Sequence, residues 1–432
     1  MKTTPHRILV AGWIVFLLYA YPGYMQTDGA DQLADSRVGE ISDWHSPMMT
    51  ELWRIVGCVL SGPAGMLCLQ SLLMLAGSYH LLRRAMSDRA AAFAAIGVLL
   101  FPAVLATTAL VSAEAQLAAF LIAGAAALAS DRRRIRFCGL ALIVVACGMR
   151  AGAALAALPI VFVLFRWHDE SSWRRRGIAI AAWVACVILA AGITRLLVDV
   201  RTERNEVALA MSDIVGTLCR ANAMTDAEIR EVLGDTRLPG TPGIQERACK
   251  IEGKSAAFAD GEDRIFENPD TEAERSSVIS ARLALARAAP GGYLVHRGKR
   301  FLQVLGLWSR PPLYTEFLED SGQAEGLRHR ASHSNVQEAL IVPVRWLAQT
   351  PLLRPYVYFI VALILLPLAA IRRQRVALML LASAIAYEVS LMFVTLRATP
   401  QDSHWMIAAT VLSIVMLSVH RFARDGAPGR PS

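Results

Sequence analysis

A short acidic stretch, QTDGADQLADSRVGEISDWHSPM at residues 26–48, follows directly on the first apolar segment of the chain. Its first two aspartates, Asp28 and Asp31, are three residues apart and share one face if the stretch is helical. A carboxylate held at a membrane surface can accept a proton from a hydroxyl nucleophile, and a positioned general base contributes about 10²–10⁴ in rate. Asp28 is therefore a candidate base. The alternative is structural, because an acid at the start of a helix also caps it and interacts favourably with its dipole.

The end of the same stretch leads into an amphipathic segment. His45 and Pro47 begin the sequence HSPMMTELWRIVGCVL, most of which can lie along a membrane surface. His45 either orders this turn beside Trp44 or takes part in substrate binding, and the residues alone leave both open. We interpret Asp31 and Asp35 as a solvated face.

A second carboxylate, Glu114, stands in VSAEAQ where another apolar segment begins. Ionisable residues at membrane depth are costly and usually functional. The alternative is a helix start in which Ser112 is the N-cap and Glu114 lies in the first turn.

Several cations form a third group of candidates. Arg150 interrupts apolar sequence in CGMRAGA, and Arg397 and His404 stand in LRATPQDSHWM. The fork geometry of arginine suits a phosphate group, although snorkelling to the membrane interface explains a single cation equally well. The segment YLVHRGKRFLQVLGLW suits a helix on the membrane surface, and we count its Arg297 and Arg300 with the substrate or lipid-phosphate ligands.

Segments that cross a membrane must position these side chains. Of the 432 residues, 55% are hydrophobic and 19% are charged, which is too apolar for a soluble domain of this length. Apolar runs of about 17–25 residues, the length that crosses a bilayer core of roughly 30 Å, recur about ten times. They lie near residues 8–25, 62–82, 90–111, 115–130, 137–150, 152–166, 177–198, 354–371, 376–396 and 404–420. We expect an all-α polytopic membrane protein.

Basic residues set the expected orientation of these spans, because Lys and Arg are retained on the cytoplasmic side. They gather on alternate loops, for example at residues 83–84, 132–134, 174–176 and 372–373. Ten spans with both termini in the cytoplasm satisfy this pattern. The net charge of +8 is then mostly a topology signal and does not indicate nucleic-acid binding. Residues 1–25 lack a small-x-small cleavage site, so we expect an uncleaved anchor.

One large hydrophilic block, residues 199–350, separates an N-terminal membrane module (1–198, with an acidic external loop at 26–52) from a C-terminal module (351–432). The charge bias places this block outside. DAEIREVL and TEAERSSVISARLALARAA within it have helical periodicity, so we expect a small, mainly helical extracytoplasmic domain.

The two cysteines of this block, Cys219 and Cys249, are expected to form a disulfide, because thiols outside the cytoplasm meet an oxidising compartment. Two unpaired thiols are the alternative. The other cysteines fall in or beside apolar spans, where a free cysteine behaves as a small hydrophobe. The sequence has no metal-type Cys/His spacing and no nucleotide-binding glycine loop.

The order of these features resembles the GT-C superfamily of integral-membrane glycosyltransferases, the clan of protein O-mannosyltransferases and aminoarabinose transferases. Its members have an acid just after the first span, matched by Asp28 in TDGADQ, and often a His-Pro-Pro-Leu element, which His45 and Pro47 in DWHSPMMTELW resemble. Glu114 resembles an acid that opens the fourth span, and TPQDSHWM is similar to the external turn before the last span. The chain departs from the family where Ser46 replaces the first proline, where no lysine adjoins Glu114, and in the basic-aromatic pair of the last turn.

The resemblance implies a donor sugar on polyprenyl phosphate at the outer face of the bacterial cytoplasmic membrane, facing the periplasm. The acceptor would be a hydroxyl of a glycan, lipid or protein. Asp28 would take the proton of that hydroxyl, with Glu114 orienting it, and Arg150, Arg397 or His404 would steady the departing lipid phosphate. In-line displacement with one base implies inversion at the sugar carbon. Some members use a divalent cation, but without a ligand cluster we expect no metal and no other cofactor here.

Two other classes of protein compete with this interpretation. A transporter would use Asp28 and Glu114 as relays, although transporters usually place ionisable residues near the bilayer midplane. An O-antigen-type polymerase or ligase would rely on arginines and a histidine of the large external loop, for which YLVHRGKR is the candidate segment.

Overall fold

The computed structural model describes residues 4–39, 41, 45–165, 172–198, 205–221, 224–234, 243–252, 271–307, 335–396 and 398–425. Within these ranges the regular structure is helical, apart from one isolated bridge between Tyr24 and Leu110. The all-α prediction is confirmed. The chain divides into two compact units, the first formed by Met1–Asp199, Val304–Ser390 and Thr399–Ser432, and the second by Val200–Gln303 with Leu391–Ala398.

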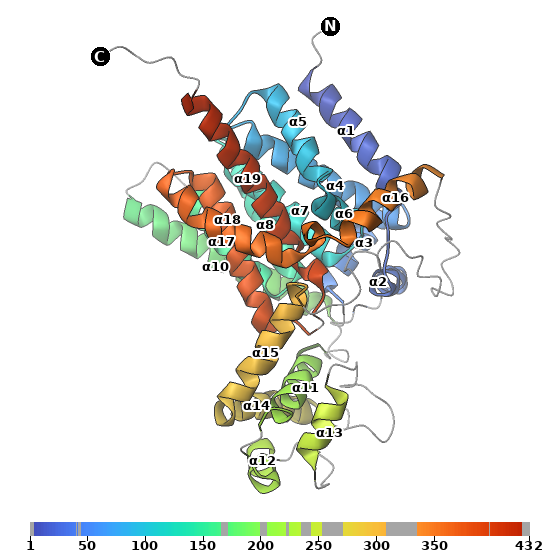
Figure 1. Cartoon of the computed structure of the whole chain (residues 1–432), viewed down its shortest axis with the longest axis vertical. Helices are drawn as coiled ribbons and strands as arrows, with labels where there is room; N and C mark the ends of the chain where they lie inside the picture. The colour runs from blue at the N-terminus through green and yellow to red at the C-terminus, as the bar shows by residue number, and fades with distance from the viewer. Residues whose placement is uncertain are drawn as a thin grey trace. The chain divides into compact units, whose positions relative to one another are not determined.

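The first unit, shown with its helices labelled in Figure 1, holds the apolar part of the chain. Its elements are α1 (Pro5–Ala20), α2 (Thr27–Val38), α3 (Pro47–Gly57), α4 (Pro63–Leu82), α5 (Asp88–Leu99), α6 (Pro102–Thr108), α7 (Ala113–Leu128), α8 (Arg133–Met149), α9 (Ala153–Leu164), α10 (Ser172–Leu197), α16 (Asn335–Ala348), η3 (Pro351–Leu353), α17 (Pro355–Ile371), most of α18 (Arg375–Val394), η4 (Pro400–Ser403) and α19 (His404–Asp425).

Each of the ten predicted spans coincides with one of these helices or with the pair α5 and α6. Among the described residues, four helical stretches are long and apolar enough to cross a membrane: Pro63–Leu82, Trp173–Leu197, Arg375–Val394 and Pro400–Val419. The pair α5 and α6 is a fifth candidate, bent by 68°. The bend has a local cause, because Pro102 lacks an N–H and holds the preceding Phe101 in an extended conformation. A count of ten spans, and their orientation, stay predictions.

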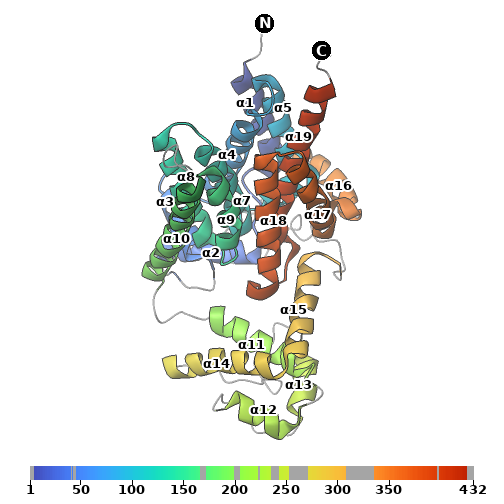
Figure 2. The same ribbon diagram turned by 90° about the vertical axis from the view of Figure 1, so that its left-hand side faces the viewer.

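Helix α7 forms the centre of this unit. It packs against α4, α8, α9 and α19 (Figure 2), and nearly every residue from Glu114 to Ala125 is buried. Close approach to α4 depends on Gly77, where a Cβ atom would lie 2.7 Å from Cγ2 of Ile122. Small residues of this kind let apolar helices approach closely in a membrane. The helix that begins at Glu114 is therefore held firmly on all sides.

The second unit is a small helical bundle, formed by α11 (Asn205–Leu218), α12 (Asp226–Leu233), α13 (Ile244–Ile251), α14 (Glu272–Ala288) and α15 (Pro290–Val304). Capping boxes begin α12 and α14, as Thr225 pairs with Glu228 and Thr271 with Glu274. The apolar faces of α11–α14 form one core. The disulfide between Cys219 and Cys249, predicted from the sequence, is present with a Cα–Cα distance of 4.7 Å.

The predicted extracytoplasmic domain, residues 199–350, contains Val200–Gln303 of the second unit but also α16, which belongs to the first unit, and it lacks Leu391–Ala398 of the second unit. Helix α16 is tied to the first unit by Gln337, whose Nε2 donates to the carbonyl oxygens of Tyr19 at 3.3 Å and Tyr21 at 2.5 Å.

Candidate functional site

The segment that carries Asp28 is joined to the turn that carries Glu114. The backbone N–H of Tyr24 donates to the carbonyl of Ala109 at 3.0 Å, and the N–H of Val111 donates to the carbonyl of Tyr24 at 2.9 Å. Helix α2 follows this connection, with exposed Asp28 in its first turn, where the helix dipole favours a negative charge. The start of α2 and the start of α7 are therefore neighbours.

The segment that carries His45 is joined in turn to the end of α8. Ser46 is the N-cap of α3, and its hydroxyl also donates to the carbonyl of Gly148 at 3.3 Å. Gln32 of α2 secures the same turn, because its Nε2 donates to the carbonyl of Ser46 at 3.0 Å. Half-buried His45 thus precedes Ser46, which is bound to Gly148, and Gly148 lies two residues before Arg150 in the chain.

The most informative arrangement in the first unit is a cluster of three charges, Glu114, Arg150 and Asp402, which we call the charge cluster. Nη2 of Arg150 contacts Oε1 of Glu114 and lies 3.4 Å from Oδ1 of Asp402. The side chains of Glu114 and Asp402 are only 5% and 4% exposed, whereas that of Arg150 is 45% exposed. One half-exposed guanidinium is thus held by two buried carboxylates.

Local sequence explains how each member of the charge cluster reaches its place. Ser112 caps α7 by accepting from the N–H of Ala115 at 3.3 Å, which puts Glu114 in the first turn, as the structural alternative predicted. Arg150 ends α8 in an extended conformation, with φ of −150° and ψ of 144°. Asp402 belongs to the capping box that begins the short helix η4, and its Oδ2 accepts from the N–H of Thr399 at 3.1 Å.

Two further polar side chains near this end of the first unit are fully buried. Oε1 of Glu388 in α18 accepts from the hydroxyl of Ser403 at 2.7 Å. Nε2 of His404 pairs with the hydroxyl of Thr108 at 3.2 Å. His404, expected from the sequence to steady the lipid phosphate, thus binds α6 and has no exposed surface.

Sequence reasoning did not single out Asp402 or Glu388. Asp402 stood within the quoted turn TPQDSHWM, but nothing local marks it as the partner of an arginine about 250 residues earlier. Glu388 had a visible signal, because it is the single acid of the apolar sequence RVALMLLASAIAYEVSLMFV.

The remaining predicted ligands lie elsewhere. Arg397 lies outside the described residues. Arg297 and Arg300 belong to α15 of the second unit, where Arg297 is 1% exposed and its Nη1 donates to the carbonyl of Thr395 at 2.9 Å. Burial of Arg297 and of its neighbour His296 differs from the surface helix expected from the sequence, because both side chains face the buried carboxylate of Asp213 instead.

In the charge cluster the two carboxylates outnumber the single cation, so only the accessible part of Arg150 can bind an anion. The guanidinium of Arg150 uses Nη2 for its two carboxylates, and the half-exposed remainder of its fork can donate to a phosphate. Among the described residues, no three His, Cys, Asp or Glu side chains gather as metal ligands. Arg150 is the cation that Glu114 and Asp402 share.

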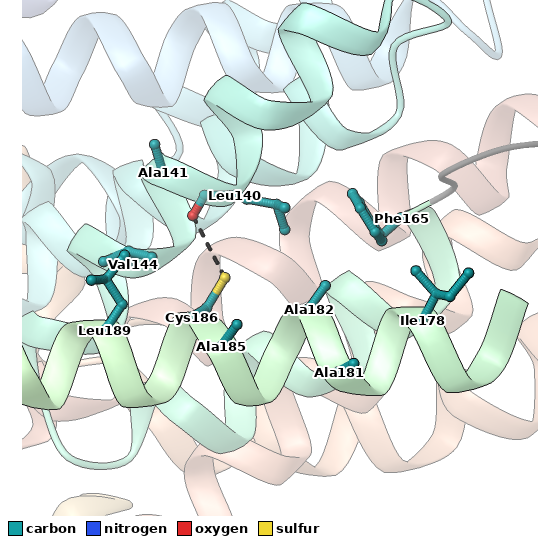
Figure 3. A pocket seen from close by; sticks show the side chains of 10 residues that line it. All are labelled: Leu140, Ala141, Val144, Phe165, Ile178, Ala181, Ala182, Ala185, Cys186 and Leu189. Carbon is teal, nitrogen blue, oxygen red and sulfur yellow. Dashed lines mark hydrogen bonds between the residues drawn. The ribbon is translucent and has the colours of Figure 1, made fainter.

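An apolar groove of about 440 Å³ lies between α8 and α10 (Figure 3). Leu140 and Val144 line it from α8, and Ile178 and Leu189 line it from α10. Cys186 also reaches it and donates weakly to the carbonyl of Leu140 at 3.8 Å. Its lining fits hydrocarbon, and it opens on the same helix that ends at Arg150.

Comparison with known proteins gives one similar solved structure. No protein-family model and no curated protein matches the sequence. The chain is similar to the crystal structure of ArnT from Cupriavidus metallidurans bound to undecaprenyl phosphate, with 13% sequence identity over 95% of this chain and 77% of that chain, and a TM-score of 0.36. Similarity at this TM-score aligns no individual residues, so no role is transferred from ArnT to a side chain here.

Proposed function

We propose that this protein is a GT-C-type membrane glycosyltransferase, which moves a sugar from a polyprenyl-phosphate donor to an acceptor hydroxyl at the outer face of the bacterial cytoplasmic membrane. The observation that carries the proposal is the charge cluster, in which two buried carboxylates hold a half-exposed arginine. The connected backbone segments that bring the start of α2 beside the start of α7 support it. The apolar groove beside α8 offers hydrocarbon surface to a lipid substrate.

In the proposed reaction, the acceptor oxygen attacks the anomeric carbon of the donor sugar. Asp28 takes the proton of that hydroxyl, the carbon–oxygen bond to phosphate breaks, and the bonding electrons leave with the lipid phosphate. Arg150 stabilises the charge that grows on this phosphate, which is where preorganised donors contribute most. Glu114 and Asp402 fix the guanidinium in place. Because attack and departure are on opposite faces, the configuration at the sugar carbon inverts.

We further propose that the reaction needs no divalent cation. The two carboxylates closest to the proposed phosphate position, Glu114 and Asp402, already have Arg150 as their counterion. A metal ion would have to displace a guanidinium from buried partners. Transfer should therefore proceed unchanged in the presence of a chelator such as EDTA.

The decisive experiment compares Asp28→Asn with Asp31→Asn, two exposed aspartates three residues apart on α2. Surface glycans and lipid-linked saccharides from cells that lack the gene, complemented with each variant, are compared by mass. Asp28→Asn should abolish the sugar unit that the wild type adds, whereas Asp31→Asn should restore it, with both proteins present in the membrane at equal levels. Normal addition by Asp28→Asn would exclude the proposed base.

A transporter is the second candidate, and Glu388 is the observation that favours it. A carboxyl that is fully buried in an apolar helix is typical of proton relays. Glu388→Gln separates the two functions. A transporter would lose proton-coupled uptake or flipping of its lipid, while a transferase given a donor at the outer face would keep its activity. The polymerase interpretation is weakened, because Arg297 is buried against protein partners.

A further inference from the structure

The second unit contains a buried group of charges that the proposed transferase reaction does not use. Its first centre is Asp213 of α11, which is 1% exposed. Nη2 of Arg297 contacts Oδ2 of Asp213, Nε of Arg282 lies 2.7 Å from the same atom, and Nε2 of His296 lies 3.5 Å from Oδ1.

The second centre of this group is Glu252, just beyond α13. Nη1 of Arg220 lies 2.6 Å from its carboxylate, Nδ1 of His296 lies 3.5 Å away, and Nζ of Lys299 lies 3.7 Å away. Burial tends to raise the pKa of Glu252, but hydrogen bonds from His296 and Arg220 and the charges of Arg220 and Lys299 lower it to about 2. Glu252 therefore stays ionised, and the ring of His296 lies between two carboxylates.

Cations outnumber acids in this group. Five cationic side chains and only two carboxylates interact here, an excess of three positive charges among the described residues with His296 neutral. The cations are Arg220, Arg282, Arg297, Lys299 and Arg300. Protein interiors normally pair their charges, because an uncompensated buried charge strongly destabilises the folded state. Lys299 is 47% exposed and is solvated, so the four more buried cations face two carboxylates, an excess of two positive charges that a phosphoryl group can offset.

Arg300 is the cation with the poorest protein partner. Its Nη2 donates a long hydrogen bond to the hydroxyl of Ser212 at 3.4 Å, and the side chain is half-buried. Burial is the main cause that lowers the pKa of Arg300; the charges of Arg297 and Arg220 also lower it, whereas the charges of Glu252 and Asp213 raise it. Nε of Arg297, deeper in the group, has no hydrogen-bond acceptor within the described structure.

We propose that Arg300, with Arg220 beside it, binds a phosphoryl group at the surface of this cation-rich group. Arg220 is 17% exposed and Arg282 is 21% exposed, so both present part of their guanidinium groups to a ligand. A phosphate with two negative charges would neutralise most of the excess and accept from several N–H groups at once. The phosphoryl group belongs either to a free phosphate compound or to a lipid headgroup. The site is independent of the proposed transferase activity.

The test uses the full-length protein in nanodiscs of phosphatidylcholine and follows hydrogen exchange in α11 and α15. In one arm, inorganic phosphate is titrated at constant ionic strength, with chloride as the balancing anion. In the other, the nanodiscs contain phosphatidate in place of part of the phosphatidylcholine. Saturable protection in the first arm identifies a free phosphate compound as a ligand, and protection in the second alone identifies a headgroup. No protection in either arm overturns the proposal.

Arg300→Gln is the test variant, and Arg230→Gln, which removes an exposed cation from α12, is the matched control. Removal of a charge-assisted hydrogen-bond donor should weaken the apparent affinity by about tenfold or more, whereas the control should change it by less than about twofold. Equal weakening by both variants would show nonspecific attraction and refute the site. Arg300→Lys keeps the charge but not the fork, so it should bind with intermediate affinity even if Arg300→Gln fails to fold.

Discussion

Substitutions in the charge cluster should have unequal effects on stability, although they break the same ion pair. Arg150→Gln leaves two ionised carboxylates, Glu114 and Asp402, almost without solvent contact, since their side chains are 5% and 4% exposed. Glu114→Gln leaves a guanidinium that is 45% exposed and can turn toward water or lipid headgroups. The free-energy cost of an unpaired charge rises with its burial. Arg150→Gln should therefore be less stable than Glu114→Gln.

The expected magnitudes follow from the same comparison. Loss of one partner from a buried pair costs roughly 3–5 kcal/mol, and Arg150→Gln should fall in that range. Loss of one hydrogen bond to a solvated charge costs roughly 1–2 kcal/mol, which is the expectation for Glu114→Gln. The double variant leaves only Asp402 without its cation, and Asp402 keeps its bonds to Thr399. It should therefore be less destabilised than the sum of the single variants by about 1–3 kcal/mol.

The assay is denaturant-induced unfolding of the purified protein in mixed micelles at pH 7. The pair of exposed Arg54 and half-buried Glu51, at 2.6 Å on α3, is the matched control, and Arg54→Gln should change the stability little. Equal costs for Arg150→Gln and Glu114→Gln, or additive effects in the double variant, would refute the reasoning.

Three predictions concern the second unit, and hydrogen exchange or denaturant unfolding measures each. Replacement of Cys219 and Cys249 by serine opens a loop with a sequence separation of 30 and should destabilise this unit by about 3–4 kcal/mol, with no further loss on reduction. In Gly216→Ala the new Cβ would overlap the ring of His296, so a net loss of about 1–3 kcal/mol should outweigh the gain in helix propensity, and a stabilised variant would contradict this packing. Because the pKa of Glu252 is lowered from 4.5 to about 2, its contribution is complete above pH 4.5 and is lost as the pH falls toward 2. Partial exposure reduces that contribution to about 1–2 kcal/mol, and Glu252→Gln should flatten the acid limb of the stability profile.

Local signals in the sequence predicted much of the fold. The stretch DAEIREVL is α12, and TEAERSSVISARLALARAA contains α14, because each follows a capping threonine and has helical periodicity. The apolar runs predicted the helices of the first unit for a similar reason, since hydrophobicity and length are properties of single segments. The pairing of Cys219 with Cys249 was predictable because only these two cysteines lie in the hydrophilic block.

Interactions between distant segments could not be predicted in the same way. The contact of Arg150 with Asp402 depends on how α8 and η4 are brought together by the whole first unit. Asp213 is one of two acids in an otherwise ordinary amphipathic helix, and its burial follows from the packing of α11 against α14. Basic residues of α15 were taken for a membrane-facing set because sequence shows a charge but not the carboxylate that it meets.

The arginines of this protein differ in how far their side chains are exposed, and this difference indicates different roles. Arg297 is 1% exposed, and its donors to Asp213 and Thr395 point to internal bracing of the second unit. A snorkelling arginine would be the opposite extreme, because it needs only water or headgroups and no buried acid. Arg150 fits neither description, since two carboxylates that are costly to bury hold it from one side while almost half of the side chain stays accessible. Such an arrangement fixes a guanidinium in position and leaves donors for a ligand, which is the role that we propose for Arg150 toward a lipid phosphate.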